Sequence, residues 1–227
     1  MEKIFTVRGA IREARAVIKP KFWSVIGQYA VIMLTVIVLS AVSSHNLLLS
    51  LLISSVVSYM TTGLALGYAT AGMFRYGELF KSFTFQKFAY FFLAVLVAKF
   101  LIIGGFILLV IPGIILSIML CFVQYIAFER EIGPIDACKE SARLTHGNRW
   151  NLFKLFLVIV LINILGAVCL LVGLLYTIPL SAIALALVYK KLHAAKDFVP
   201  EIVSVIETED GTPVEIVDAV VTESSEA

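Results

Sequence analysis

The sequence contains a series of apolar runs, each of about the length needed to cross a bilayer, and this feature restricts the chain to a membrane fold. The first three extend over residues 22–42, 47–68 and 88–110. A transmembrane helix needs about 20 largely apolar residues. Composition agrees, because 60% of the residues are hydrophobic and only 15% are charged, whereas globular domains are about half apolar and a quarter charged.

Two further apolar runs cover residues 112–128 and 151–189. The second is long enough for two helices, with a break near Gly173 or at Thr177 to Pro179. We therefore predict an all-α, polytopic membrane helical bundle with six transmembrane helices arranged as three hairpins. The predicted spans are approximately 22–42, 47–70, 88–110, 112–128, 153–172 and 174–190, within a membrane domain of residues 22–191.

Basic residues are concentrated in alternate connections. They precede the first span, fill the connections between spans two and three and between spans four and five, and follow the sixth. The other connections, at 44–46, 111–113 and 173–179, contain no Lys or Arg. Because positively charged loops stay inside, we expect both termini to be cytoplasmic in a multi-pass protein of the inner or plasma membrane.

Residues 1–21 are expected to form a cytoplasmic amphipathic helix. Apolar residues recur there at helical spacing, while Arg8, Arg12, Arg15 and Lys19 line the opposite face. A basic face of this kind suits anionic lipid headgroups. The apolar run that follows is too long for a signal peptide and lacks a cleavage site, so we expect it to remain in the protein.

The same arrangement recurs along the chain. Trp23, Phe88 and Trp150 each open a predicted hairpin, and Glu13, Glu78 and Glu140 lie ten residues before them. This spacing predicts three repeated units of about 63 residues, each with an amphipathic or aromatic-rich cytoplasmic segment before its hairpin. We interpret the three aromatic residues as anchors at the membrane interface.

Lys99 is the only charged residue well inside an apolar run. An ionisable side chain at that depth suggests function, such as contact with a phosphate or an anionic solute. The alternative is that its amine reaches toward the interface or is satisfied by neutral polar groups. Such groups are Gln28, Tyr59, Gln124, Tyr125 and Asn163. Of these, Gln28, Gln124 and Asn163 form with Lys99 a candidate intramembrane polar site.

The loop between spans four and five holds Glu140, Arg143 and Arg149, and its other acids, Glu129, Glu131 and Asp136, also lie among bases. This pattern indicates an ion-paired surface rather than a catalytic site. Neither the spacing of the three cysteines nor any sequence motif indicates a disulfide, a metal site or a cofactor. We expect no nucleic-acid partner.

The last segment, residues 192–227, forms a separate acidic region. Residues 197–227 carry nine acids and no Lys or Arg, which leaves the rest of the chain strongly basic. We predict a cytoplasmic tail that is disordered or folds on a protein partner. A small hairpin around Asp210 and Gly211 is an alternative.

The block LLVIPGIILSIMLCFVQYIAFEREIGPIDACKESARLTHGNRWNLFKLF resembles a family of prokaryotic integral membrane proteins. This family comprises the membrane domain of some glycerophosphoryl diester phosphodiesterases and the related YciC-like proteins of unknown function. The resemblance covers residues 85–190 well and the first hairpin only in outline. Where the family carries phosphodiesterase chemistry, a separate soluble domain performs it, so the resemblance implies the membrane module without the enzyme.

These observations favour a non-enzymatic membrane scaffold or lipid-interacting module whose partners are membrane lipids, anionic ones above all. The alternative is a small-solute or lipid transporter, suggested by the repeated hairpins and Lys99. An enzyme comes third. The sequence leaves the oligomeric state open.

Overall fold

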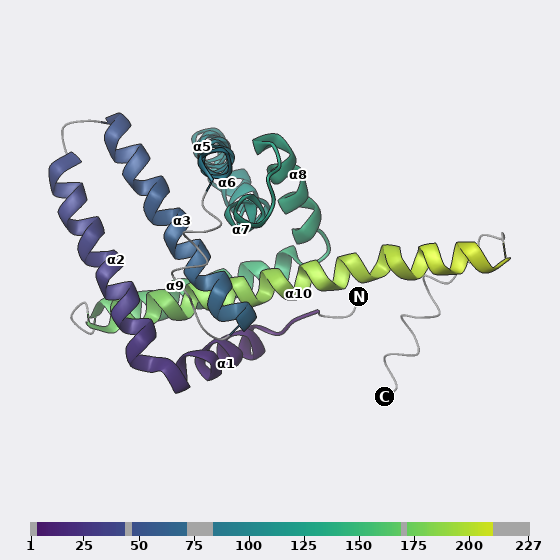
Figure 1. Ribbon diagram of the computed structural model, residues 1–227, viewed down its shortest axis with the longest axis horizontal. Coiled ribbons are helices and arrows are strands. Elements are labelled where there is room, and N and C mark those ends of the chain that lie inside the picture. Colours follow the sequence, from purple (N-terminus) through teal and green to yellow (C-terminus); the bar gives the residue numbers. More distant parts are fainter. Residues whose placement is uncertain (1–3, 44–46, 72–83, 169–171, 211–227) are drawn as a thin grey trace.

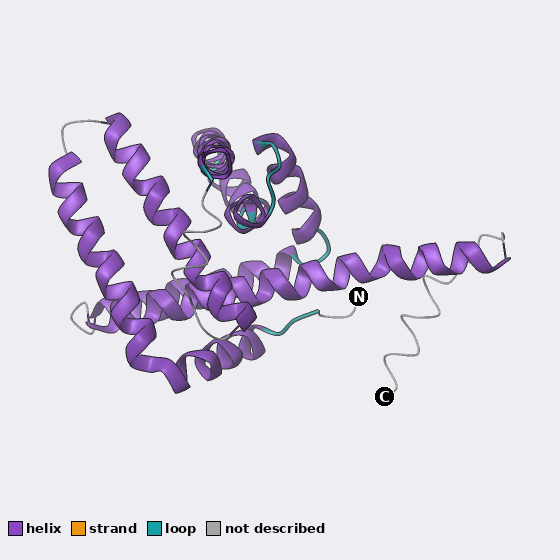
Figure 2. Ribbon diagram, viewed as in Figure 1, coloured by secondary structure: helices purple, strands orange, loops and turns teal. Residues whose placement is uncertain are grey.

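The computed structural model describes residues 4–43, 47–71, 84–168 and 172–210, and within these ranges the side chains of residues 40–43, 47–48, 172 and 197–210 are not described. Every regular element in this part of the chain is a helix, and no strand occurs in it (Figure 2). The protein is thus an all-α polytopic bundle, as the sequence predicts.

The helices follow the apolar pattern closely. Their bounds are α1 Val7–Ile18, η1 Lys19–Lys21, α2 Phe22–Ser43, α3 Leu47–Ala71, α5 Phe85–Leu108, α6 Val110–Met119, α7 Val123–Glu129, α8 Pro134–Thr145, α9 Arg149–Val168 and α10 Val172–Asp210.

Six segments of the described chain are long and apolar enough to cross a membrane, the number that the sequence predicts. They are Val7–Leu39, which includes α1, then Leu49–Ala71, Phe85–Leu108, Val110–Glu129, Arg149–Val168 and Gly173–Lys196. The first segment begins at Val7 and not near residue 22, where the predicted span begins, because α1 and η1 continue directly into α2. α1 itself carries a row of basic residues on one face.

α10 runs through the centre of the molecule and contacts α1, α2, α3, α8 and α9. In Figure 1, α9 lies alongside α10, whereas α2 and α3 rise steeply from it and α5 and α6 run along the line of sight. α1 lies across the lower side of the bundle in this view. The hairpins therefore cross one another, and α10 joins them.

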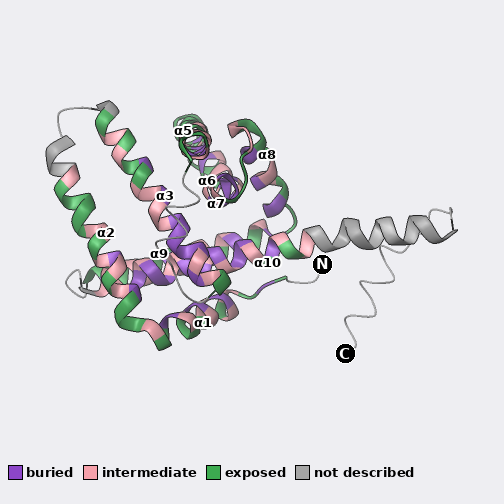
Figure 3. Ribbon diagram, in the orientation of Figure 1, coloured by how far each residue is buried: buried purple, intermediate pink, exposed green. Residues whose placement is uncertain are grey.

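Buried side chains form two clusters that meet at α10. One contains Tyr29, Leu64, Tyr68 and Ile183, and it packs the first hairpin and α1 against α10. The larger cluster joins α5, α7, α8, α9 and α10. Figure 3 shows the buried residues concentrated along α10 and at the base of α3, and exposed residues along the outer part of α2.

Large apolar side chains remain exposed on the outer faces of the spans. Examples are Leu34 and Ile37 on α2, Ile103 and Ile107 on α5, and Leu165 on α9. A water-soluble protein rarely exposes a continuous apolar surface of this kind. In hydrocarbon the same surface is favourable, because helices satisfy their backbone groups internally.

The predicted fourth span, 112–128, is not one continuous helix. α6 ends at Met119 and α7 begins at Val123. Ser141 of α8 occupies the break, where its hydroxyl accepts from the Phe122 amide at 3.2 Å and donates to the Met119 carbonyl at 2.7 Å. The sequence identified this span, which covers Val110–Glu129 in the structure, but not its interruption, because hydropathy registers the apolar run and not the distant serine that bonds to the break.

Glycine pairs allow the second and third hairpins to close tightly. A Cβ atom on Gly113 would lie 2.6 Å from the Phe106 ring, and a Cβ on Gly105 would lie 3.2 Å from the Gly113 Cα. Gly166 and Gly173 are paired in the same way between α9 and α10. Close helix contacts through small residues are common in membrane bundles.

The third hairpin turns close to Gly173, the first of the two places that the sequence suggested, because α9 ends at Val168 and α10 begins at Val172. Pro179, which belongs to the alternative break, lies within α10. The chain between Val168 and Val172 is outside the described residues. Membrane helices tolerate an internal proline when neighbouring helices cover the freed backbone group, and α9 packs alongside α10.

The acidic tail also differs from expectation in its first part. α10 continues to Asp210, so residues 192–210 are helical rather than disordered. Extending an existing helix avoids the cost of nucleating a new one, and Ala194, Ala195 and Glu201 favour helix. Gly211, and with it the alternative hairpin, falls outside the described residues.

Candidate functional site

The helix α1 separates an apolar face from a basic one, as predicted. Thr6 caps its start, accepting from the Gly9 amide at 3.2 Å. Ala10, Ala14 and Ile18 are buried against the bundle. The opposite face, which we call the basic face, consists of the exposed side chains of Arg8, Arg12, Arg15 and Lys19.

An ion pair fixes the orientation of α1. Glu13 lies beside the buried face, and its carboxylate is 2.6 Å from the Lys191 ammonium of α10. The four residues of the basic face, by contrast, form no ion pair with any described residue. α1 is therefore held to the bundle by its apolar residues and its one acid, while four cations face outward.

A second set of polar contacts joins α7 to α10. The Glu129 carboxylate accepts from the Tyr189 hydroxyl at 2.8 Å and from Lys190 at 2.5 Å. One residue further on, Arg130 donates to Nε2 of His193 at 2.6 Å. Because arginine has no acceptor, this contact requires His193 Nε2 to be unprotonated.

The start of α5 joins the same region. Lys87 lies 3.2 Å from the carboxylate of Glu131, which is the neighbour of Arg130. Side-chain contacts therefore link four segments of the chain. These segments lie before span one, before span three, after span four and after span six. We call these residues the polar cluster: Glu13, Lys87, Glu129, Arg130, Glu131, Tyr189, Lys190, Lys191 and His193.

α8 borders the polar cluster. Arg143 donates twice to Glu140, at 2.8 and 3.0 Å, and this hydrogen bonding lowers the pKa of the Glu140 carboxyl below its usual range. The Lys196 ammonium donates to the carbonyls of Arg143 and His146 at the end of α8. A cation there compensates the carbonyls and the dipole of the helix end.

α8 packs beneath the bundle. Its buried residues are Ala137, Cys138, Ser141, Leu144 and Thr145, whereas Ile135 is 63% exposed. Ser141 and Thr145 are buried with their hydroxyls bonded to backbone carbonyls, which offsets the cost of burying them.

The candidate intramembrane polar residues do not form one site. Lys99 is exposed on α5. Gln28 accepts from Tyr68 between α2 and α3 at 2.8 Å, Gln124 accepts from Ser58 of α3 at 3.3 Å, and Asn163 donates to Ser181 of α10 at 3.2 Å. Each neutral polar residue thus joins a different pair of helices.

The other two neutral polar residues, Tyr59 and Tyr125, pack against aromatic side chains. Tyr59 lies 5.1 Å from Phe91 and 5.9 Å from Phe88, measured between ring centroids. Tyr125 stacks on Tyr189 and donates to the Ala182 carbonyl at 3.3 Å. Both tyrosines belong to the main buried cluster.

The three aromatic anchors differ in environment. Trp23 is 83% exposed and Trp150 is 66% exposed, as a residue in an interfacial belt would be. Phe88 packs instead against Tyr59. Of the three acids in the repeat, Glu13 and Glu140 are ion-paired in the helices that precede their hairpins, and Glu78 lies outside the described residues.

Sequence reasoning missed Tyr189, His193 and Ser141. Tyr189 and His193 lie 60 and 63 residues from their partners Glu129 and Arg130, so no local pattern connects them. The sequence offered one signal for these two residues. Polar side chains continue past the sixth span in the segment YKKLH. Ser141 was visible only as a polar residue inside an amphipathic helix.

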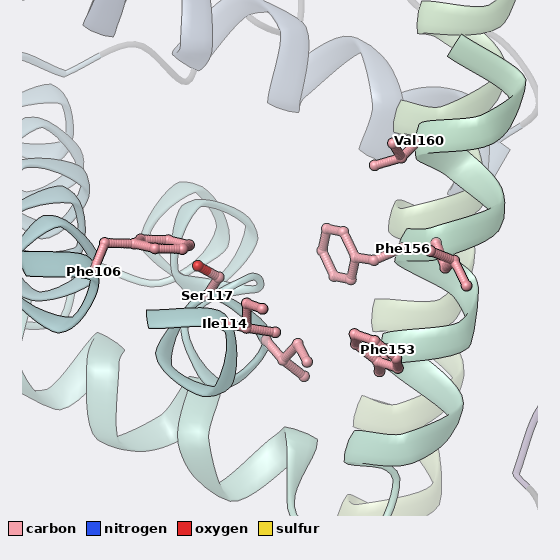
Figure 4. A pocket seen from close by; sticks show the side chains of 8 residues that line it. Phe106, Ile114, Ser117, Phe153, Phe156 and Val160 are labelled. Carbon is pink, nitrogen blue, oxygen red and sulfur yellow. The ribbon is translucent and has the colours of Figure 1, made fainter. Parts of the chain in front are cut away.

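An apolar groove opens between α6 and α9. It encloses about 220 Å³ and is lined by Phe106, Ile114, Ser117, Ile118, Phe153, Phe156, Leu157 and Val160. In Figure 4, Phe106 and Ile114 face Phe153, Phe156 and Val160 across the open space. The Ser117 hydroxyl donates to the Gly113 carbonyl of its own helix, so the lining offers little polar attraction.

The tryptophan at the start of α9 lies beside this groove. The Trp150 ring stacks on Phe153 at a centroid distance of 5.5 Å, and the Lys154 ammonium lies 5.3 Å from the Trp150 ring. Arg149 precedes Phe153 by one helical turn, and its Nε is buried without a hydrogen-bond partner in the described part of the chain.

A comparison with known protein families gives a match over the second half of the chain. Residues 82–208, which hold α5 to α9 and all but the end of α10, match the family described as Domain of unknown function (DUF7847). No curated protein and no solved structure matches the chain. The helices α1, α2 and α3 lie outside the matched region.

Proposed function

This chain belongs to the DUF7847 family, and we propose that it is a non-enzymatic integral membrane module that binds anionic lipid headgroups through the basic face of α1. The observation that carries the proposal is the division of α1 into a face held to the bundle and a face of four cations, Arg8, Arg12, Arg15 and Lys19. Each Lys or Arg near an anionic surface contributes about 1 kcal/mol.

The fixed orientation of α1 strengthens this proposal. A free amphipathic helix would bury its own apolar face in the bilayer. Here Ala14 and Ile18 are already buried against the protein. The attraction of α1 to a membrane therefore depends on its charged side chains. Selectivity for anionic over zwitterionic lipids is the expected consequence.

The carboxylates of the loop between spans four and five support a structural role for it. Glu129 is bonded to Tyr189 and Lys190, Glu131 to Lys87 and Glu140 to Arg143. Acids held in this way position helices. A general acid or base instead needs access to a substrate proton.

The break between α6 and α7 is the feature that a transporter would share, because transporters often place substrate sites at broken helices. At such sites, however, the freed backbone groups face a ligand or ion. Here the Phe122 amide and the Met119 carbonyl are both bonded to Ser141. The break is filled by the protein itself, and we retain the lipid-binding module as the proposed function.

For localisation we propose the cell membrane, with both termini cytoplasmic. The resemblance of residues 85–190 to a family of prokaryotic integral membrane proteins supports the compartment. The contacts within the polar cluster support the orientation, because they link segments that the positive-inside rule assigns to the same side.

The test is the thermal stability of the purified protein in detergent, with phosphatidylglycerol or phosphatidylcholine added. We expect phosphatidylglycerol to stabilise the unsubstituted chain more, and the difference to shrink at high salt. The variant Arg12→Gln/Arg15→Gln should lose much of this difference.

The control variant Lys81→Gln/Lys139→Gln has the same net charge as the α1 variant but an intact basic face. It should keep the full response to phosphatidylglycerol. An equal loss of response in both variants would mean that total charge, and not α1, determines the effect, and the proposed role of α1 would be withdrawn.

A further inference from the structure

The groove between α6 and α9 ends at a group of side chains suited to a phospholipid. Its wall on α9 is formed by Phe153, Phe156, Leu157 and Val160. Residues spaced by three, four or seven share a helix face, so Arg149 lies on the face of Phe153 and Phe156, at the helix start. Long side chains on a helix point back toward its N-terminus, which directs the Arg149 guanidinium beyond the end of the groove.

The cations at this end have no acidic partner among the residues that the structure describes. Neither Arg149 nor Lys154 forms an ion pair with a residue that the structure describes. The Arg149 Nε is buried and unbonded, and an uncompensated, partly buried charge is costly. A phosphate beside the guanidinium would supply the missing negative charge.

The groove and the cations together match the two parts of a single ligand. The lining is almost entirely apolar, and in a membrane the molecule that reaches such a surface is an acyl chain. Trp150 stacks on Phe153 of the groove wall and lies under the Lys154 ammonium, and tryptophan favours the boundary between hydrocarbon and headgroups.

We propose that this groove binds one acyl chain of an anionic phospholipid, whose phosphate contacts Arg149 and Lys154. This inference rests on the proposed lipid-binding function and names a discrete site for it, distinct from the basic face of α1. The site lies on α6 and α9, within the region that matches the family, whereas α1 lies outside that region.

The two tryptophans of the chain allow a direct test in vesicles. In the variant Trp23→Phe, Trp150 is the sole tryptophan, and phospholipids brominated on the acyl chain quench its fluorescence on contact. Brominated phosphatidylglycerol should quench Trp150 at a lower mole fraction than brominated phosphatidylcholine, with a preference of about fivefold for each cation. Equal quenching by the two lipids would overturn the proposal.

Two further variants test the parts of the site in this single-tryptophan protein. Arg149→Gln/Lys154→Gln should remove the preference for phosphatidylglycerol. Val160→Phe should fill the groove and weaken quenching by both lipids, whereas Val168→Phe, at an exposed position of the same helix outside the groove, should not. If Val160→Phe and Val168→Phe behave alike, Trp150 reports general lipid contact and no acyl chain occupies the groove.

The variant Arg12→Gln/Arg15→Gln separates this site from the basic face of α1. It should leave the lipid preference at Trp150 intact even if the stabilisation by phosphatidylglycerol disappears. A Trp150 preference lost together with the α1 charges would show that α1 recruits the lipid and that the groove has no affinity of its own. If the α1 variant shows no change in stabilisation by phosphatidylglycerol but Trp150 still prefers this lipid, the groove is a lipid site in its own right.

Discussion

Glu13 of α1 and Lys191 of α10 form an ion pair at 2.6 Å across 178 residues of sequence, and Ala14, the neighbour of Glu13, is completely buried. Charge and packing thus fix α1 at the same point. The two contributions differ in size. Exposed ion pairs contribute about 0.2–1 kcal/mol, whereas overpacking a buried position costs about 1–3 kcal/mol.

We predict that Ala14→Leu destabilises the protein by about 1–3 kcal/mol, while Glu13→Gln costs less than about 1 kcal/mol. The matched control is Ala16→Leu, because Ala16 is exposed on the same helix. The free energy of unfolding in detergent is the measurement. Equal effects of the two alanine substitutions would mean that α1 does not pack on the bundle.

The break in the fourth span should depend on Ser141. Ser141→Ala leaves the Phe122 amide and the Met119 carbonyl without their side-chain partner, and each unsatisfied buried group costs about 1–3 kcal/mol. We therefore expect a loss of at least about 1 kcal/mol in the free energy of unfolding.

Ser54→Ala is the control for this substitution. The Ser54 hydroxyl is exposed and only donates to the Leu51 carbonyl of its own helix, so its removal should change stability by less than about 0.5 kcal/mol. Indistinguishable stabilities of the two variants would contradict the role assigned to Ser141.

The limits of prediction from sequence follow from how far apart the contacting residues lie. The six spans depend on local composition, and the apolar runs alone predicted them. Lys99 was identified as charged, but its side chain faces outward on α5, and α5 is apolar on all faces, with no pattern to show which side packs. The Ser141 and Tyr189 contacts join helices whose relative placement depends on the whole bundle.

The pair Glu140 and Arg143 should give the protein a pH-dependent contribution to stability. The pKa of Glu140 is lowered in the folded state, so folding favours its ionised form. Stability from this pair is present above the pKa of an unfolded glutamate, about 4.3, and is lost as pH falls through the lower folded value.

At pH 7 we expect Glu140→Gln to cost about 1 kcal/mol, and the difference from the unsubstituted protein to vanish in acid. Denaturant unfolding at a series of pH values measures both. A difference that stays constant down to pH values well below the carboxyl range would show that the charge of Glu140 is not what stabilises the pair.

Membrane topology can be read from cysteine labelling. In a background without Cys121, Cys138 and Cys169, a membrane-impermeant thiol reagent should label Ser44→Cys from outside the cell. Lys139→Cys, whose side chain is exposed in α8, should react only after the membrane is permeabilised. Labelling of both positions from the same side would contradict the six-span orientation.

Substitution of Lys99 tests whether this lysine has a structural or a functional role. Its side chain is exposed on α5 next to the exposed Phe100, and a lysine on the outside of a span can extend its amine toward the membrane interface. A charge near the middle of a span costs about 2.5–3.5 kcal/mol on insertion scales. Lys99→Met should therefore leave the protein equally or more thermostable in detergent.

The response to anionic lipid decides between the two roles. If Lys99 only snorkels, stabilisation by phosphatidylglycerol should be the same in the unsubstituted chain and in Lys99→Met, because the basic face of α1 and the groove on α9 are intact. A response lost in Lys99→Met and only partly restored in Lys99→Arg, whose planar guanidinium differs in shape and hydration, would instead identify Lys99 as a phosphate ligand.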